Sequence, residues 1–217
     1  MKKKNSGILW WALGLLVAFG LWTAAVCTVD VQPVGPLGSE VGFGTVNQWF
    51  HGLTGVNWNW YILTDQLSIV PLGIVVGFGL LGLCQWAKRR SIRRVDPSVL
   101  ILGGFYAVVM AVFVLFEILE VNYRPVLIEG VLEASYPSST TMLAMCVMST
   151  AVLQIRERIA NRTLRNWSSA VCVAFMVFMV VGRVISGVHW LTDIIGGGLL
   201  AGSLVELYRF AVGSKAE

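Results

Sequence analysis

The sequence predicts an all-α integral membrane protein, a bundle of about six transmembrane helices with both termini in the cytoplasm. Only 13% of the 217 residues are charged and 56% are hydrophobic, whereas about a quarter of an ordinary soluble domain is charged. The mean hydropathy of +0.74 comes from separate apolar runs, each near the roughly 20 residues that a helix needs to cross a bilayer. The basic residues between these runs follow a regular pattern.

The apolar runs define the predicted spans. We place these at residues 8–27, 66–87, 98–120, 138–155, 167–186 and 191–212. Polar or turn-forming residues fill the gaps, and no room is left for a second domain, so residues 1–217 are predicted to form one domain. The runs are apolar on every side, which favours helices over the alternating strands of a membrane β-barrel.

The basic residues indicate the orientation of the spans, because Lys and Arg mark the cytoplasmic side of a membrane protein. They precede the first span and follow the second, the fourth and the last. Of the 16 Lys and Arg residues, only Arg124 and Arg183 are predicted on the outer side, where charge is a functional hypothesis by default. The net charge of +4 and the pI of about 9.0 therefore reflect topology, and no nucleic-acid partner is expected.

Residues 28–65 form the longest predicted loop, on the outer side, with a short amphipathic stretch around 43–53. This stretch carries His51, which we interpret as an interfacial histidine in preference to a catalytic one. A cleavable signal peptide is the alternative reading of the first span, whose apolar run is long for a signal sequence. The four cysteines show no metal-ligand spacing and the chain has only two histidines, so neither a metal site nor a cofactor is expected.

Three outer segments at the same predicted depth hold the unusual polar residues. The first is Glu117-x-x-Glu120-x-x-x-Arg124-Pro125 at the end of the third span. Spacings of three and four would place Glu117, Glu120 and Arg124 on one helix face, and Pro125 would end the helix. Glu120 is expected to pair with Arg124, unless one of the two carboxyls is a buried acid with a raised pKa.

The second segment, Tyr136-Pro137-Ser138-Ser139-Thr140-Thr141, leads directly into the fourth span. Ser138 or Ser139 is a good helix cap. The free N–H groups of a first helical turn, together with the helix dipole, make a natural anion site. The alternative is an ordinary capped membrane helix.

The third segment joins the last two spans and contains Arg183, His189 and Asp193. On a helix, a spacing of four lets the Asp193 carboxylate orient the imidazole and leaves the other ring nitrogen free to react. The alternative is a purely structural hydrogen bond. Two guanidiniums, a helix N-terminus and an oriented imidazole together suit a tetrahedral oxyanion such as phosphate.

These segments resemble the motifs of the type 2 phosphatidic acid phosphatase superfamily, which includes undecaprenyl-diphosphate phosphatases and vanadium haloperoxidases. The family pattern is Lys-x6-Arg-Pro, then Pro-Ser-Gly-His, then Ser-Arg-x5-His-x3-Asp. The third motif is matched by Arg183-x5-His189-x3-Asp193, with Gly182 in place of the serine. The resemblance spans residues 117–193, and the six-span layout extends it to the whole chain.

The resemblance implies a role for each matched residue. His189 would be the nucleophile that forms a phosphohistidine, with Asp193 as its orienting partner and no metal. The implied phosphate ligands are Arg124, Arg183, Ser138, the backbone of Ser139, and Thr140. Two positions depart from the pattern: Glu117 stands where the family has lysine, and Thr140 stands where the family has the histidine that protonates the leaving group.

The function implied is a membrane lipid phosphatase acting on a lipid phosphate or a prenyl diphosphate. A diphosphate needs little proton assistance, because its leaving group is itself a phosphate with a second pKa near about 6. One alternative is a lipid head-group phosphotransferase, in which Glu117 and Glu120 recognise an amine-bearing head group. The other is a non-catalytic lipid-phosphate binder or transporter.

The expected partner of the protein is the lipid bilayer, with the site at its outer face. The substrate phosphate would lie at the outer leaflet, with the lipid tail entering sideways between helices. The basic clusters fit a bacterial plasma membrane with the site facing outside, and the alternative is an internal eukaryotic membrane. No signal in the sequence indicates an oligomeric state.

Overall fold

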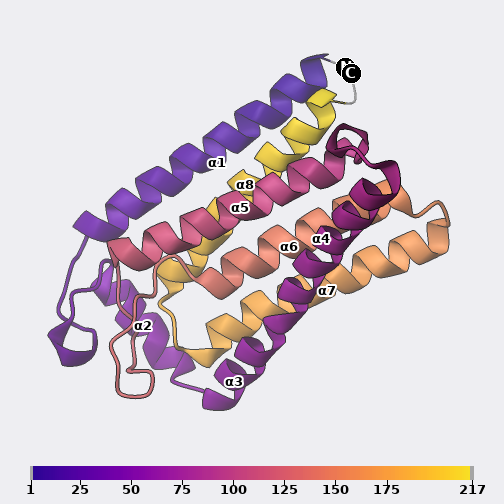
Figure 1. Cartoon of the computed structure of the whole chain (residues 1–217). Coiled ribbons are helices and arrows are strands. Elements are labelled where there is room, and N and C mark those ends of the chain that lie inside the picture. The colour runs from indigo at the N-terminus through magenta and orange to yellow at the C-terminus, as the bar shows by residue number, and fades with distance from the viewer. Residues whose placement is uncertain (1, 216–217) are drawn as a thin grey trace.

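A computed structural model describes residues 2–215 of the chain, and the side chains of residues 6–213. Met1, Ala216 and Glu217, which the predicted domain includes, lie outside the described residues. The described part is a bundle of long helices (Figure 1). Its elements are α1 (Lys2–Thr28), η1 (Pro36–Gly38), α2 (Gly44–Thr54), α3 (Trp58–Leu67), α4 (Ile69–Arg89), η2 (Ile92–Arg94), α5 (Pro97–Leu119), α6 (Ser139–Arg158), α7 (Arg162–Ser186) and α8 (Leu191–Lys215).

Five segments of the described residues are long and apolar enough to cross a membrane, which makes the chain a multi-pass membrane protein. They are Ser6–Thr28, Trp58–Arg89, Pro97–Leu119, Arg162–Ser186 and Leu191–Gly213. Each overlaps a predicted span. The second one begins earlier than predicted because α3 runs almost directly into α4, so the final residues of the predicted 28–65 loop are helical.

The remaining predicted span, 138–155, corresponds to α6, which falls outside these five because it is too polar. Its polarity follows from its position, since much of α6 is buried against α7, α8, α4 and α5 instead of facing lipid. The Thr150 hydroxyl donates to the Cys146 carbonyl at 2.8 Å and also lies 3.0 Å from the Tyr106 hydroxyl. Hydroxyl groups are tolerated inside a membrane bundle when helices satisfy them in this way. The count of six spans remains a prediction.

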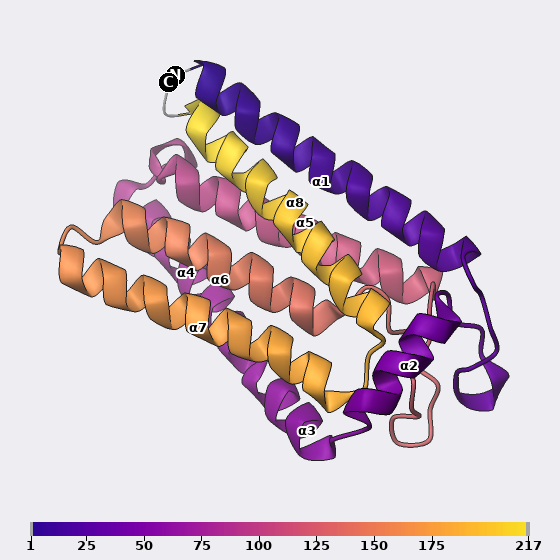
Figure 2. The same cartoon turned by 180° about the vertical axis from the view of Figure 1, so that it is seen from behind.

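The first and last long helices lie side by side, as both faces of the bundle show (Figures 1 and 2). The α1–α8 packing is the most extensive between any two described elements, followed by α6–α7. Small residues permit the close approach, because Ala12 and Ala201 are fully buried. The Ser203 hydroxyl also donates to the Ala12 carbonyl at 3.0 Å. Apolar side chains of α1, α5, α6 and α8 form the core beside this contact.

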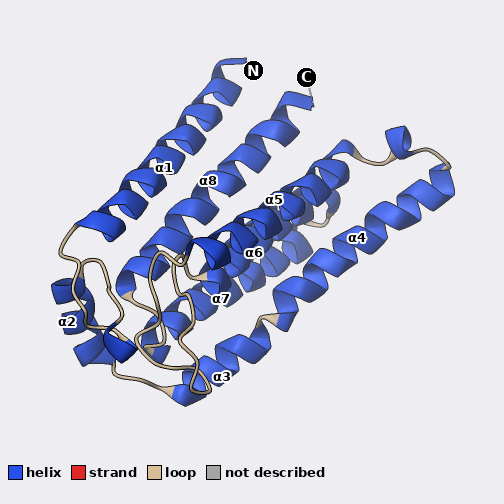
Figure 3. Cartoon of the chain, turned by 60° about the vertical axis from the view of Figure 1, so that its left-hand side comes forward, coloured by secondary structure: helices blue, strands red, loops and turns tan. Residues whose placement is uncertain are grey.

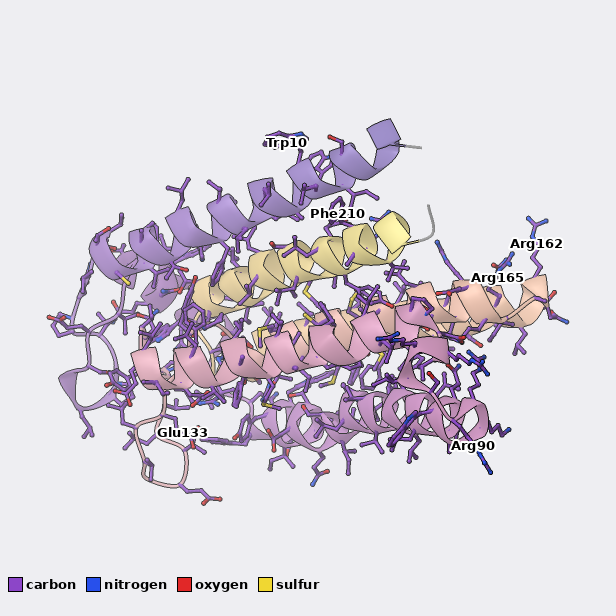
Figure 4. The ribbon with its side chains drawn as sticks, turned by 45° about the horizontal axis from the view of Figure 1, so that its top comes forward. Trp10, Arg90, Glu133, Arg162, Arg165 and Phe210 are labelled. Carbon is purple, nitrogen blue, oxygen red and sulfur yellow. The ribbon has the colours of Figure 1, made fainter. Side chains whose placement is uncertain are left out.

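The two ends of the bundle differ in chemistry. Most of the loops gather at the end that holds α2 (Figure 3). Figure 4 shows Glu133 at that end and Arg90, Arg162 and Arg165 at the opposite one. At the basic end Asp96 pairs with Arg89 and Arg158, each at 2.9 Å. These guanidiniums, that of Arg158 first, and the Gln85 amide lower the pKa of the Asp96 carboxyl to about 2.

The short helix α2 occupies the region where the amphipathic stretch was predicted. Its Asn47 side chain is buried, whereas Val46, Trp49 and Leu53 are exposed. Asn47 donates from Nδ2 to the Thr192 hydroxyl at 2.9 Å, and so fixes α2 against the first turn of α8. The segment that carries α2 thereby lies against the α7–α8 connection, which carries the predicted nucleophile.

Candidate active site

His189 lies in the short connection between α7 and α8, and only 5% of its surface is exposed. Its Nε2 atom is 3.3 Å from Arg124 Nη1. Its Nδ1 atom is 3.8 Å from Asp193 Oδ2, which is too long for a hydrogen bond. As the predicted spans imply, His189 precedes α8, which begins at Leu191, so the spacing of four on one helix does not describe this pair. The two side chains are nevertheless brought together.

The surroundings of His189 keep its imidazole neutral. Burial lowers the pKa of His189 well below its usual value, and the nearby charges of Arg124 and Arg183 lower it further, against a smaller opposing effect of the Ser135 backbone. A neutral imidazole has a lone pair with which to attack phosphorus. With a proton on Nδ1, that lone pair is on Nε2, the nitrogen that faces Arg124.

Asp193 is fully buried in the first turn of α8 and is held by three elements. Its Oδ2 atom accepts from the Trp190 N–H at 2.9 Å, and its Oδ1 atom accepts from Asn122 Nδ2 at 3.3 Å. Its backbone carbonyl accepts from the Ser138 N–H at 3.0 Å. Asp193 therefore ties the loop that carries His189 to the start of α6.

Arg124 contacts His189 from a loop and not from a helix. The helix α5 ends at Leu119, and Glu120 follows in a left-handed conformation with φ of 44°. The prediction that Glu117, Glu120 and Arg124 share a helix face is therefore wrong. The predicted Glu120–Arg124 pair is also wrong, because Arg124 Nε lies 3.0 Å from Glu133 Oε2 and Glu120 accepts from the Tyr123 hydroxyl at 2.9 Å. Glu117 and Glu120 are exposed at the rim.

Arg183, near the end of α7, is only 2% exposed. Its Nη2 atom donates to the Thr140 hydroxyl at 2.5 Å and lies 3.4 Å from Asp65 Oδ1. Its guanidinium carbon stands 5.1 Å from the centre of the Tyr61 ring, within the range of a cation–π contact. Nε and Nη1 of Arg183 are buried and donate to no described group.

The start of α6 supplies further donors. Ser138 precedes the helix, and its buried hydroxyl has no partner among the described residues; the same holds for the hydroxyl of Thr141. Ser139 and Thr140 lie in the first turn, whose N–H groups have no acceptor within the helix. Buried donors are normally satisfied, so unpaired donors on Arg183 and around the α6 terminus suit an oxyanion.

A comparison with family models matches residues 107–213, about half of the chain, to the PAP2 superfamily. The chain belongs to this superfamily. The match begins within α5 and extends into the last turns of α8, and so covers all three segments in which sequence analysis placed the site. A search of curated protein sequences finds no match.

A PAP2 protein of known structure has the same fold. It is described as the first transmembrane PAP2 type phosphatidylglycerolphosphate phosphatase from Bacillus subtilis. The two chains superpose with a TM-score of 0.63 over 96% of this chain and 98% of the other, at 18% sequence identity. The likeness extends beyond the matched residues to the helices that precede them.

The structure adds residues that sequence reasoning missed. Asp65 lies beside Arg183, Glu133 pairs with Arg124, and Asn122 holds Asp193. A signal for Asp65 was present, since it stands directly at the edge of a predicted span, but its partner is far away in the sequence. His51 lies behind the site, with Nε2 at 3.1 Å from the Gly187 carbonyl oxygen.

Proposed function

We propose that the chain is a metal-independent membrane lipid phosphatase that works through a phosphohistidine intermediate. The observation that carries this proposal is the buried, neutral His189, whose Nε2 atom lies 3.3 Å from Arg124 Nη1 and which also feels the charge of Arg183. A phosphoryl transfer enzyme needs little more than positioning and charge stabilisation around the transferred group. Arg124, Arg183 and the N-terminus of α6 can supply both.

The proposed reaction has two steps. First, His189 Nε2 attacks phosphorus and the bond to the lipid oxygen breaks, and this oxygen takes up a proton from an acid at the site as the lipid alcohol leaves. Asp193 stabilises the positive charge that develops on the ring. Then water attacks the phosphohistidine, the P–N bond breaks, and inorganic phosphate is released with His189 restored.

The location of the reaction belongs to the same proposal. The site lies at the end of the bundle opposite Arg90, Arg162 and Arg165 (Figure 4). Because basic residues stay in the cytoplasm, we place the site at the outer face of a bacterial plasma membrane. Its substrate would be a lipid phosphate of the outer leaflet, and Glu117 and Glu120 at the rim would contact its head group.

The test is phosphate release by the purified protein in detergent without added metal. Phosphatidic acid, phosphatidylglycerol phosphate and a prenyl diphosphate are the substrates. We expect His189→Ala to reduce release to background and Arg183→Gln to reduce it by about 100-fold or more, because a charge-stabilising donor is lost. His51→Gln, which alters the chain's other histidine, is the matched control and should retain most of the activity.

Two other outcomes would change the assignment. Phosphate that appears on an acceptor alcohol in place of free phosphate would identify a transferase. Lipid phosphate that binds the wild-type protein without turnover, and no longer binds Arg183→Gln, would identify a binder.

A further inference from the structure

Asp65 is a carboxylate that lies beside Arg183. Its Oδ1 atom lies 3.4 Å from Arg183 Nη2, the same nitrogen that donates to Thr140 at 2.5 Å. The Asp65 side chain is 61% exposed, whereas that of Arg183 is 2% exposed. Asp65 therefore stands at the opening of the site, next to the threonine that occupies the second-motif histidine position.

The helix α3 reaches this place because Gly182 has no side chain. A Cβ atom at Gly182 would lie 2.5 Å from Thr64 Cγ2 and 3.3 Å from Trp60 Cε3, so a larger residue would push α3 away from α7. Beyond this contact, the Asn57 N–H donates to the Ser186 carbonyl at 2.9 Å. The departure of Gly182 from the family motif thus makes room for the helix that carries Asp65.

A groove leads from this point along the bundle. It has a volume of about 270 Å³ and lies between α3 and α4 on one side and α5 and α6 on the other. Asp65, Ser68, Ser139 and Thr140 contribute its polar groups, and most of the remaining lining is apolar. A lipid whose phosphate is bound at Arg183 can place its ester oxygen beside Asp65 and its tail in this groove.

We propose that Asp65 is the proton donor to the leaving lipid oxygen, in place of the histidine that Thr140 replaces. This inference rests on the proposed phosphatase function. Among the residues that line the groove, Asp65 carries the carboxyl, and the other polar side chains are hydroxyls, whose protons are far too weakly acidic for this role.

The proton balance closes over the two steps. As His189 attacks phosphorus, the P–O bond to the lipid breaks and the Asp65 proton moves to that oxygen, so a neutral alcohol leaves. In the second step the Asp65 carboxylate accepts a proton from the attacking water. The P–N bond breaks, phosphate leaves, and both side chains regain their starting forms.

The substrate class follows from this assignment. A proton donor matters most when the leaving group is an alkoxide, for which general acid catalysis contributes roughly 10²–10⁴-fold. We therefore assign a lipid phosphate monoester as the preferred substrate over a prenyl diphosphate.

The test compares Asp65→Asn with wild type on two substrates that differ in their leaving group. An alkyl lipid phosphate needs the proton, whereas a nitrophenyl phosphate does not. We expect kcat/KM to fall by about 100-fold or more on the alkyl substrate, the lower part of the general-acid range. The fall in kcat/KM on the nitrophenyl substrate should be smaller by a factor of at least about ten, because its leaving group needs no proton. Glu129→Gln removes a carboxyl from the connection between α5 and α6 and should change neither rate.

Two further variants separate proton donation from a structural role. Asp65→Glu should recover part of the alkyl rate. Thr140→His in the Asp65→Asn background should recover it as well, because the second-motif histidine is restored. Equal losses of Asp65→Asn on both substrates, or no loss on either, would overturn the assignment while leaving a His189-dependent phosphatase intact. A wild-type protein without phosphate release would overturn both proposals.

Discussion

The protonation state of His189 links the site to the stability of the fold. Burial and two arginine charges hold the pKa of His189 well below its usual value in the folded protein, whereas an unfolded histidine has a pKa near 6.5. As the pH falls below about 6.5, the unfolded chain takes up a proton that the folded chain does not. The titration of His189 therefore contributes a loss of stability to the folded protein on the acidic side of neutrality.

Melting curves in detergent between pH 7.5 and 5.5 test this linkage. We expect His189 alone to lower the free energy of unfolding by up to about 1.4 kcal/mol for each pH unit below 6.5. His189→Asn should melt with a shallower pH dependence, because this residue no longer titrates. His51→Asn keeps His189 and should therefore retain the pH dependence of the wild-type protein. A slope in His189→Asn as steep as in wild type would contradict the buried neutral imidazole.

Individual residues differ in how far the sequence could predict them. Arg183, His189 and Asp193 lie in one short segment, so their spacing alone predicted that they come together. Asp65 is separated from Arg183 by 118 positions, and its place depends on how α3 sits against α7. Hydropathy contains no information on that register, because it depends on side-chain packing at residues such as Gly182 and Thr64.

At the scale of elements, the connection between α7 and α8 is built on a single glycine. Gly187 has φ of +63°, and a Cβ atom there would lie 1.7 Å from the Gly55 carbonyl oxygen in the α2–α3 connection. The two connections are thus in direct backbone contact. His189 follows two residues later, so its position depends on how closely they approach.

Gly187→Ala should therefore damage stability and activity together. We expect a loss of at least about 1–3 kcal/mol, the usual cost of a strained backbone conformation, with a further cost from the clash. Thermal unfolding and phosphate release from a lipid phosphate would measure both effects. Gly52→Ala, in α2, has no atom within 4 Å of the added carbon and should leave both unchanged. Normal activity in Gly187→Ala would show that this connection does not position His189.

Element boundaries were predicted well where apolar runs end in charge and poorly where loops are ordered by distant contacts. The predicted end of the third span, residue 120, nearly matches the end of α5 at Leu119, but the helix was expected to continue to Pro125, whereas Glu120 turns the chain. The segment that follows is held by pairs such as Arg124–Glu133 and Asn122–Asp193. Such pairs form between segments that no local pattern connects.

At the scale of the molecule, we expect the site end of the bundle to face the cell exterior and the basic end to face the cytoplasm. In a variant without the native cysteines, Leu37→Cys lies at the site end, where Leu37 is 82% exposed. Arg162→Cys lies at the basic end (Figure 4). A membrane-impermeant maleimide should label Leu37→Cys in intact cells, and Arg162→Cys only after permeabilisation. The reverse pattern would place the site in the cytoplasm.

The contact between α1 and α8 has a consequence for biogenesis. Because α1 is synthesised first, it enters the bilayer long before α8, its main partner, has left the ribosome. Lipid must cover it in the meantime, which its apolar sequence from residue 6 to residue 28 permits. The α1–α8 contact can thus form only after α8 has been made, and a product truncated before α8 would leave α1 without its main partner.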